Sequence, residues 1–253
     1  MTTIPFIHNY CDRWCEKCRF VHQCAVGVAE SSLTEDQKDI EKEAFWNNIS
    51  DQFKKAKNLL EKHIKQAGIE ITDAEIDEAE NLKRQKRKQN KDNIIAQLSK
   101  NYIGHADKID LTNLFAAHKT DMEQNHSIGI ISQEQVMENL HKIKDNADTI
   151  EWFKYFIHVK LVRALSSLGD NDTGDLQSDH NGSAKIAILA IESSLGAWHS
   201  IYNLTGDENG DILDIMALLS KLSRLTTTIF PDAMQFVRPG FDAGWEAIWE
   251  EEE

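Results

Sequence analysis

The hydrophobic residues of this chain recur at helical spacing over several long stretches. In residues 34–67 the apolar positions follow one another about three to five residues apart, as Ile40, Ala44, Ile49, Phe53, Ala56, Leu60 and Ile64, with Phe45 and Leu59 widening the stripe. This spacing is typical of an amphipathic helix with one face against a core. The polar run 31–34 offers helix caps and Gly68 is placed to end the helix, so we expect a packing helix that runs to about Ala67.

The next segments are shorter or interrupted. A Thr-Asp cap at 72–73 begins a second helical segment, whose middle, the basic run 83–88, must be solvated. Gly104 suggests a break in this segment. A short helix is expected from Asp110 or Thr112 through Ala117, with a loop over residues 118–131.

Three further helices complete the pattern. Ser132 and Gln135 form a capping box for a helix that continues to about Leu168. Residues 183–204 are apolar on nearly every side, as expected of a central helix, and another helix follows over about 211–228. The stretch 169–182 is rich in Asp, Asn, Gly and Ser, and this composition makes it the clearest candidate for an internal loop.

No segment shows the alternation of a β-strand, and three prolines in 253 residues permit long helices. The predicted fold is therefore all-α, a multi-helix bundle with a short cysteine-rich segment at its N-terminus. We assign residues 1–30 to the cysteine-rich segment and residues 31–253 to the helical bundle, with its loop near 169–182.

Composition narrows the class of protein. The net charge of −14 disfavours binding to nucleic acid or to anionic membranes, and no run of about 18 apolar residues is present to span a bilayer. Residues 1–10 lack the basic start and apolar core of a signal peptide. We therefore expect a cytoplasmic protein, where closely spaced cysteines are more often metal ligands or reactive thiols than disulfides.

The four cysteines lie close together and follow the pattern C-x3-C-x2-C-x5-C, at Cys11, Cys15, Cys18 and Cys24. His8 and His22 lie in the same segment. Thiolates suit zinc, copper(I) and iron-sulfur clusters, and imidazole can complete such sites. We take the four cysteines as metal ligands with His22, and secondarily His8, as a substitute, and we favour an iron-sulfur cluster slightly over zinc.

A simpler interpretation is a docking helix. The spacing from His8 to His22 would align His8, Cys11, Cys15, Cys18 and His22 on one stripe of an unbroken helix, where thiols pack as small hydrophobes. In such a helix Cys11 and Cys18 would lie about 10 Å apart along the axis, too far for one tetrahedral ion with zinc-to-sulfur distances of about 2.3 Å. A metal site therefore predicts irregular backbone here, including a turn between Cys18 and Cys24.

The function that follows depends on the metal. Iron would allow electron transfer or redox sensing, whereas zinc held by four thiolates would be structural. The alternative is a metal-free helical interaction or scaffold protein with buried thiols, which would bind a protein partner.

The segment Phe6-Ile7-His8-Asn9-Tyr10-Cys11-Asp12-Arg13-Trp14-Cys15-Glu16-Lys17-Cys18 resembles the opening of a group of uncharacterised helical bacterial proteins that carry a Tyr-Cys-Asp-Arg-Trp-Cys motif. The resemblance is strongest over residues 6–24. A second stretch with weaker similarity to these proteins is Asn181-Gly182-Ser183-Ala184-Lys185. It implies a helical fold but no established activity.

Other candidate chemistry is weaker. Glu123 with His126 and Glu138 with His141 have the i, i+3 spacing of di-iron helices, but solvated surface explains them better. The residues that could form an enzyme active site are His141, His158, Glu192 and His199. The sequence gives no substrate for it, and whether the chain is an enzyme stays open.

Overall fold

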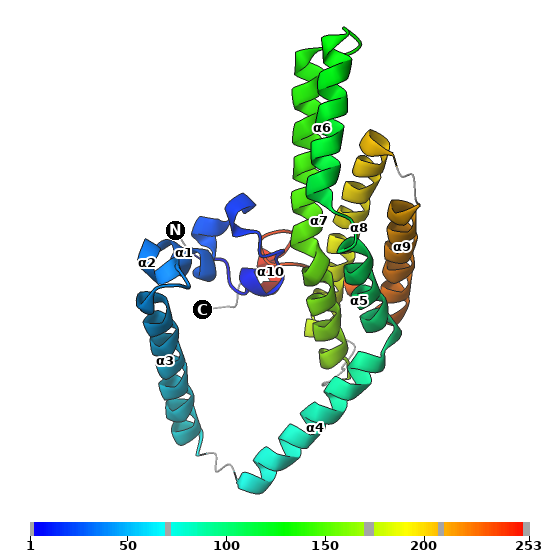
Figure 1. Ribbon diagram of the computed structural model, residues 1–253. Coiled ribbons are helices and arrows are strands. Elements are labelled where there is room, and N and C mark those ends of the chain that lie inside the picture. The colour runs from blue at the N-terminus through cyan, green and yellow to red at the C-terminus, as the bar shows by residue number, and fades with distance from the viewer. Residues whose placement is uncertain (1–2, 69–71, 170–174, 207–209, 250–253) are drawn as a thin grey trace. The chain divides into compact units, whose positions relative to one another are not determined.

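The computed structural model describes residues 3–68, 72–169, 175–206 and 210–249 (Figure 1). Within these ranges all regular secondary structure is helical, and no strand occurs. The prediction of an all-α multi-helix fold with the cysteines at the N-terminus is confirmed.

The chain divides into two compact units. The first comprises residues 1–8 and 15–86, and the second comprises residues 9–14 and 87–253. The short stretch 9–14 thus belongs to a different unit from the residues on either side of it. The two units are described separately below.

The helices of the first unit are α1 (Ala25–Ser31), α2 (Glu35–Lys38) and α3 (Glu43–Ala67), and α4 (Asp73–Asp92) begins in it. Gly68 ends α3 with φ +62°, as predicted. The expected helix before it is interrupted over residues 39–42. Thr34 and Gln37 form a capping box for α2, and the carboxylate of Asp39 accepts a hydrogen bond from the N–H of Glu41 at 3.0 Å. This Asx-type turn competes with the helix and diverts the chain.

Within the first unit, the apolar stripe of α3 is not covered by a core. No residue of this 25-residue helix is buried, and Phe53 is 73% exposed and Leu60 61% exposed. Within the first unit this face therefore lacks the core that its spacing predicts. Periodicity reveals that a helix has an apolar face, but it does not reveal what covers that face.

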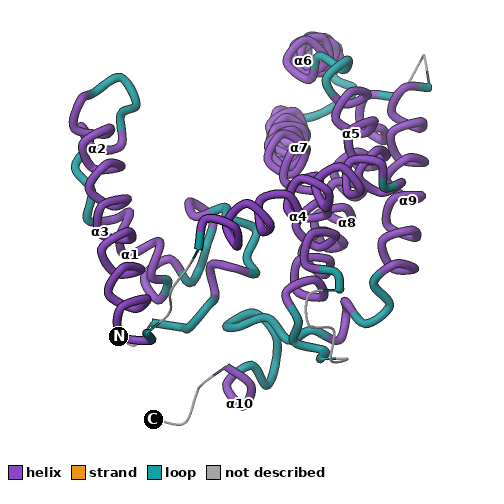
Figure 2. The backbone as a smooth tube through the Cα atoms, turned by 90° about the horizontal axis from the view of Figure 1, so that it is seen from below, coloured by secondary structure: helices purple, strands orange, loops and turns teal. Residues whose placement is uncertain are grey.

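The second unit is a helical bundle of α5 (Ile94–Ala106), α6 (Leu111–Ser127), α7 (Gln133–Ser167), α8 (Asp179–Thr205) and α9 (Asp211–Ile229). Helix α8 packs against α7 and α9, α5 contacts α7 and α9, and α6 lies along α7 (Figures 1 and 2). Trp198 of α8 is fully buried at the centre of the core and donates a hydrogen bond to the hydroxyl of Tyr102 at 3.3 Å. The prediction of a central helix near 183–204 is confirmed.

Several boundaries differ from the sequence prediction. Asp110 caps α6 as expected, but α6 continues to Ser127, so the predicted loop over 118–131 is largely wrong. Met122 of α6 is buried with Val136 and Ile143 of α7, and this long-range packing sustains the helix. Helix α5 likewise runs through Gly104 to Ala106.

Helix α8 begins at Asp179, four residues earlier than expected. The last residues of the predicted loop are therefore helical. Residues 175–178 form a turn, and residues 170–174 of that loop lie outside the described ranges.

The C-terminal segment docks on the second unit. After η4 (Ala233–Gln235), the chain reaches α10 (Glu246–Trp249). The indole N–H of Trp249 donates to the carbonyl of Val237 at 2.7 Å, and its ring lies 5.8 Å from that of Phe236. Trp249 therefore holds the end of the described chain on the second unit.

Candidate metal-binding segment

The cysteine segment is a series of short turns. Three 3-10 turns, η1 (Ile7–Asn9), η2 (Cys15–Lys17) and η3 (Val21–Gln23), replace the continuous helix, and Arg13 adopts φ +62°. The stripe that would have joined His8 to His22 therefore does not form. The docking-helix interpretation needs a continuous helix, which is absent here. The backbone is instead irregular, as a metal site requires.

Cys15 and Cys18 flank one turn of the first unit. The N–H of Cys18 donates to the carbonyl of Cys15 at 3.2 Å, and both side chains are partly buried. The local fold thus keeps the backbones of these two residues close. Such a C-x2-C turn is the usual way for neighbouring cysteines to reach one metal centre.

Cys24 stands at the start of α1. Its carbonyl accepts a hydrogen bond from the N–H of Val28 at 2.9 Å, and the residue is 9% exposed. A Cβ added to Gly27 would lie 2.3 Å from the carbonyl oxygen of Val21, so the glycine lets η3 approach α1. The expected turn between Cys18 and Cys24 is present as η3, which carries the exposed His22.

Cys11 lies in the second unit, within a segment held on both sides. The ammonium of Lys160 donates to the carbonyl of Asn9 at 3.0 Å, and the indole N–H of Trp152 donates to the carbonyl of Asp12 at 2.9 Å. Trp14 stacks on Trp152 with ring centroids 5.2 Å apart. These contacts fix residues 9–14, which we call the anchor segment, on α7.

Tyr10 is the buried centre of the anchor segment. Its hydroxyl donates to the carboxylate of Asp179 at 3.2 Å, which also accepts hydrogen bonds from Arg163 and Ser167. Burial raises the pKa of Tyr10 to about 12, and Asp179 adds to the rise. Burial alone would raise the pKa of Asp179, but the hydrogen bonds from Arg163 and Ser167 keep it below its ordinary value. The tyrosine therefore stays a neutral donor to a carboxylate.

The same surroundings act on the groups next to Tyr10. Burial raises the pKa of the Cys11 thiol, and hydrogen bonding from the backbone of Arg13 opposes the rise. Burial lowers the pKa of Lys160 to about 8, and the nearby Arg163 adds to the decrease. The Cys11 thiol is therefore favoured over the thiolate in the metal-free chain.

Residues 181–185, the stretch of weaker similarity, pack directly on the anchor segment. A Cβ added to Gly182 would lie 2.4 Å from the ring of Tyr10 and 2.7 Å from that of Phe236. The two rings lie 4.5 Å apart. The two stretches that carry the sequence resemblance therefore meet, and Gly182 is needed for the close approach.

Lys185, in the same stretch, holds the C-terminal segment on α8 through hydrogen bonds. Its ammonium donates to the carbonyl of Phe236 at 2.6 Å and to the carboxylate of Asp242 at 2.7 Å. Arg238 also binds Asp242, through a side-chain N–H at 2.8 Å. The hydrogen bonds from Arg238 and Lys185 overcome the effect of burial and lower the pKa of Asp242 to about 2.

The ion pairs of Asp242 predict a loss of stability in acid. Because the folded pKa is depressed, their contribution is present above the ordinary value of 3.8 and is lost as the pH falls toward about 2. We expect Asp242→Asn to remove about 2 kcal/mol of pH-dependent stability over this range. Urea unfolding at successive pH values measures it, with Asp214→Asn on the exposed side of α9 as the control. Equal acid sensitivity of the two variants would contradict the assignment.

The remaining candidate residues stay apart. Glu138, His141, Glu192 and His199 are exposed, and the His158 ring nitrogen lies 2.8 Å from the hydroxyl of Ser99. Among the described residues, no three His, Cys, Asp or Glu side chains are grouped so that they could hold a metal ion. The cysteine ligand set and the third, enzymatic possibility therefore stay predictions.

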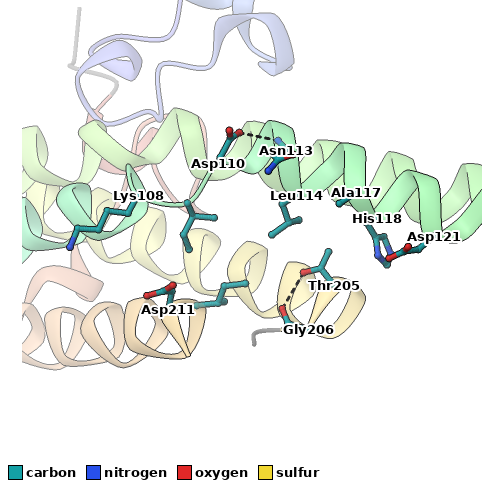
Figure 3. Close-up of a pocket in the computed structure, with 12 residues that line it drawn as sticks. Lys108, Asp110, Asn113, Leu114, Ala117, His118, Asp121, Thr205, Gly206 and Asp211 are labelled. Carbon is teal, nitrogen blue, oxygen red and sulfur yellow. Dashed lines mark hydrogen bonds between the residues drawn. The ribbon is translucent and has the colours of Figure 1, made fainter. Parts of the chain in front are cut away.

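A pocket of about 490 Å³ that the sequence did not predict lies in the second unit (Figure 3). Its wall is formed by the start and middle of α6, the end of α8 and the start of α9, with Asp110, His118, Asp121 and Asp211 contributing polar groups. Burial lowers the pKa of His118, and Asp121 opposes the decrease. Asp110 already caps α6, so its carboxylate serves the local backbone.

Comparison of the chain with protein-family models, with curated proteins and with solved structures gives no match. No helix within the described parts of the chain is both long and apolar enough to cross a membrane. The functional assignment therefore depends on the local chemistry of the chain itself.

Proposed function

We propose that this protein binds a metal centre through its N-terminal cysteines, an iron-sulfur cluster slightly ahead of a zinc ion. The observation that supports the proposal is the turn-based backbone of residues 15–24, in which Cys15 and Cys18 flank one hydrogen-bonded turn and Cys24 begins the next helix. Nonpolar packing of thiols does not need this arrangement, whereas ligation does. With iron, the site would serve electron transfer or redox sensing, and with zinc it would hold the segment together.

The donors fall into two groups. Cys15, Cys18, Cys24 and His22 belong to the first unit, and Cys11 belongs to the second. Metal sites of this kind often assemble only when the ion binds, because thiols must lose their protons and turn toward one point. We keep Cys11 as the fourth ligand, with His22, and secondarily His8, as its substitute. We also propose a cytoplasmic location, because thiols stay reduced there and can bind a metal.

Anaerobic purification, an optical spectrum and elemental analysis of the same sample test the proposal. Iron with sulfide and visible absorbance supports a cluster, and stoichiometric zinc without colour supports a structural site. Cys15→Ser with Cys18→Ser should abolish the bound metal in either case. A sample without either metal, whose thiols react with an alkylating reagent identically before and after chelator treatment, contradicts the proposal and favours the interaction protein.

Single variants identify the fourth ligand. If Cys11 is that ligand, Cys11→Ser should lower metal content as strongly as Cys24→Ser, and His22→Asn should leave it unchanged. The reverse result assigns His22. His63→Asn is the matched control, because His63 is an exposed histidine of α3 outside the segment.

A further inference from the structure

The turn that joins Cys15 to Cys18 brings two cysteines together without the help of a metal. Residues 15–17 form η2, and the N–H of Cys18 donates to the carbonyl of Cys15 at 3.2 Å. Both cysteines belong to the first unit, so the turn is a local property of that unit. Side chains three residues apart in a 3-10 turn are eclipsed. The Cβ atoms of Cys15 and Cys18 therefore lie on the same side of the turn.

The separation of the two residues suits a disulfide. A 3-10 turn rises about 2.0 Å per residue, so three steps place the Cα atoms of Cys15 and Cys18 roughly 6 Å apart. The Cα atoms of residues joined by a disulfide are usually about 4.4–6.8 Å apart. Closing the bond therefore needs rotation of the two side chains rather than displacement of the backbone.

The spacing distinguishes this pair from the other cysteines. Cys11 belongs to the second unit, and Cys24 lies six residues beyond Cys18, at the start of α1. Neither is three residues from another cysteine, which is the spacing that a 3-10 turn brings together. The local fold therefore favours the pairing of Cys15 with Cys18.

We propose that Cys15 and Cys18 are a redox-modification site, at which the metal-free chain forms a reversible disulfide. The oxidant is a low-molecular-weight disulfide, such as oxidised glutathione. In a reducing compartment such a bond is transient, and transient disulfides there usually serve catalysis or redox sensing. The bond itself does not depend on whether the chain binds a metal.

The reaction is a thiol–disulfide exchange in two steps. One cysteine, as its thiolate, attacks a sulfur of the oxidant, whose sulfur–sulfur bond breaks and releases one glutathione thiolate. The second cysteine, as its thiolate, attacks the protein sulfur of this mixed disulfide, and the second glutathione leaves as the bond between Cys15 and Cys18 forms. The protein loses two electrons and two protons, and the oxidant gains them as two thiols. Because the turn holds both cysteines, the second step is intramolecular.

The disulfide has a regulatory consequence that rests on the proposed function. The thiolate is the form of cysteine that binds a metal, so oxidation would remove two ligands at once. Oxidation would then release the metal, and reduction would restore the site. Metal content of the untreated protein tests the proposed function separately. If no metal is found, that function fails, and the disulfide is still measured in the same way.

Equilibration of the full chain with glutathione buffers of graded ratio tests the disulfide. The chain is freed of metal with a chelator, equilibrated without oxygen, quenched in acid and alkylated, and mass spectrometry of its peptides locates the protected cysteines. We expect a disulfide between Cys15 and Cys18, and Cys11→Ser with Cys24→Ser should leave its midpoint ratio unchanged. A different pair, mixed disulfides alone, or free thiols at the most oxidising ratio would overturn the proposal.

Lys17→Pro tests whether the turn creates the pair. Proline lacks the N–H and disfavours the helical conformation of the preceding Glu16, so the turn should open. The equilibrium constant for the disulfide should then fall about tenfold, because the two thiols lose their fixed proximity. Lys17→Ala removes the same side chain but keeps the turn, so it should match the wild type. Equal oxidation of the two variants refutes the role of the turn.

Discussion

Gly182→Ala is expected to destabilise the second unit by about 3 kcal/mol, although alanine is the better helix former. The added methyl group would lie 2.4 Å from the ring of Tyr10 and 2.7 Å from that of Phe236. Neither ring has room to withdraw. Phe236 is fully buried, and the hydroxyl of Tyr10 is held by Asp179. The variant must therefore displace the anchor segment or move α8.

Gly196→Ala provides the matched control for this prediction. Gly196 lies on the same helix, and a Cβ at that position meets no atom within 4 Å. The substitution should stabilise the protein by up to about 1 kcal/mol through helix propensity alone. Urea unfolding of both variants measures the difference, and limited proteolysis near the N-terminus detects release of the anchor segment. If the two variants were equally stable, the close approach of Tyr10 to α8 would be refuted.

Lys185→Met should cost about 3 kcal/mol, near the lower end of the range for breaking a buried ion pair. The ammonium group satisfies the carbonyl of Phe236 as well as the carboxylate of Asp242, and methionine replaces its length but not its hydrogen bonds. Arg238 continues to pair with Asp242, which limits the loss.

Lys221→Met on the exposed face of α9 is the control for Lys185→Met, and it should change the unfolding free energy by less than about 0.5 kcal/mol. Quenching of tryptophan fluorescence adds a local measurement, because release of the C-terminal segment exposes Trp249. Unchanged quenching together with unchanged stability would show that Lys185 does not hold this segment.

The parts of the fold that depend on local chemistry could be predicted from sequence. The capping box of Ser132 with Gln135 and the left-handed Gly68 are set by residues within four positions of each other. The core helices α7 and α8 carry enough apolar residues to be recognised without their partners. These features follow from short-range hydrogen bonds and periodicity.

The parts that depend on distant contacts could not be predicted. Helix α6 extends past Ala117 because Met122 packs on α7, and no local signal shows that contact. The role of Tyr10 was hidden for the same reason, since its partner Asp179 lies 169 residues away. The sequence did single out both stretches that meet at Gly182, but it gave no sign that they touch.

The proposed metal ligands are an intermediate case. Cysteine spacing is the basis of the metal-site proposal, and the irregular backbone that such a site needs is present at η2 and η3. Which thiols share one centre depends on the coordination of an ion, which is a property of side chains rather than of backbone pattern.

The separation of Tyr10 from its partners has a consequence for synthesis of the protein. Tyr10 of the anchor segment is synthesised 169 residues before Asp179, and Phe236 and Trp249 follow later still. At about 5–20 residues per second, roughly 10–30 s pass before the first of these partners exists. Cys11, next to Tyr10, spends that interval on an undocked nascent chain, where oxidation can reach its thiol before the anchor segment docks.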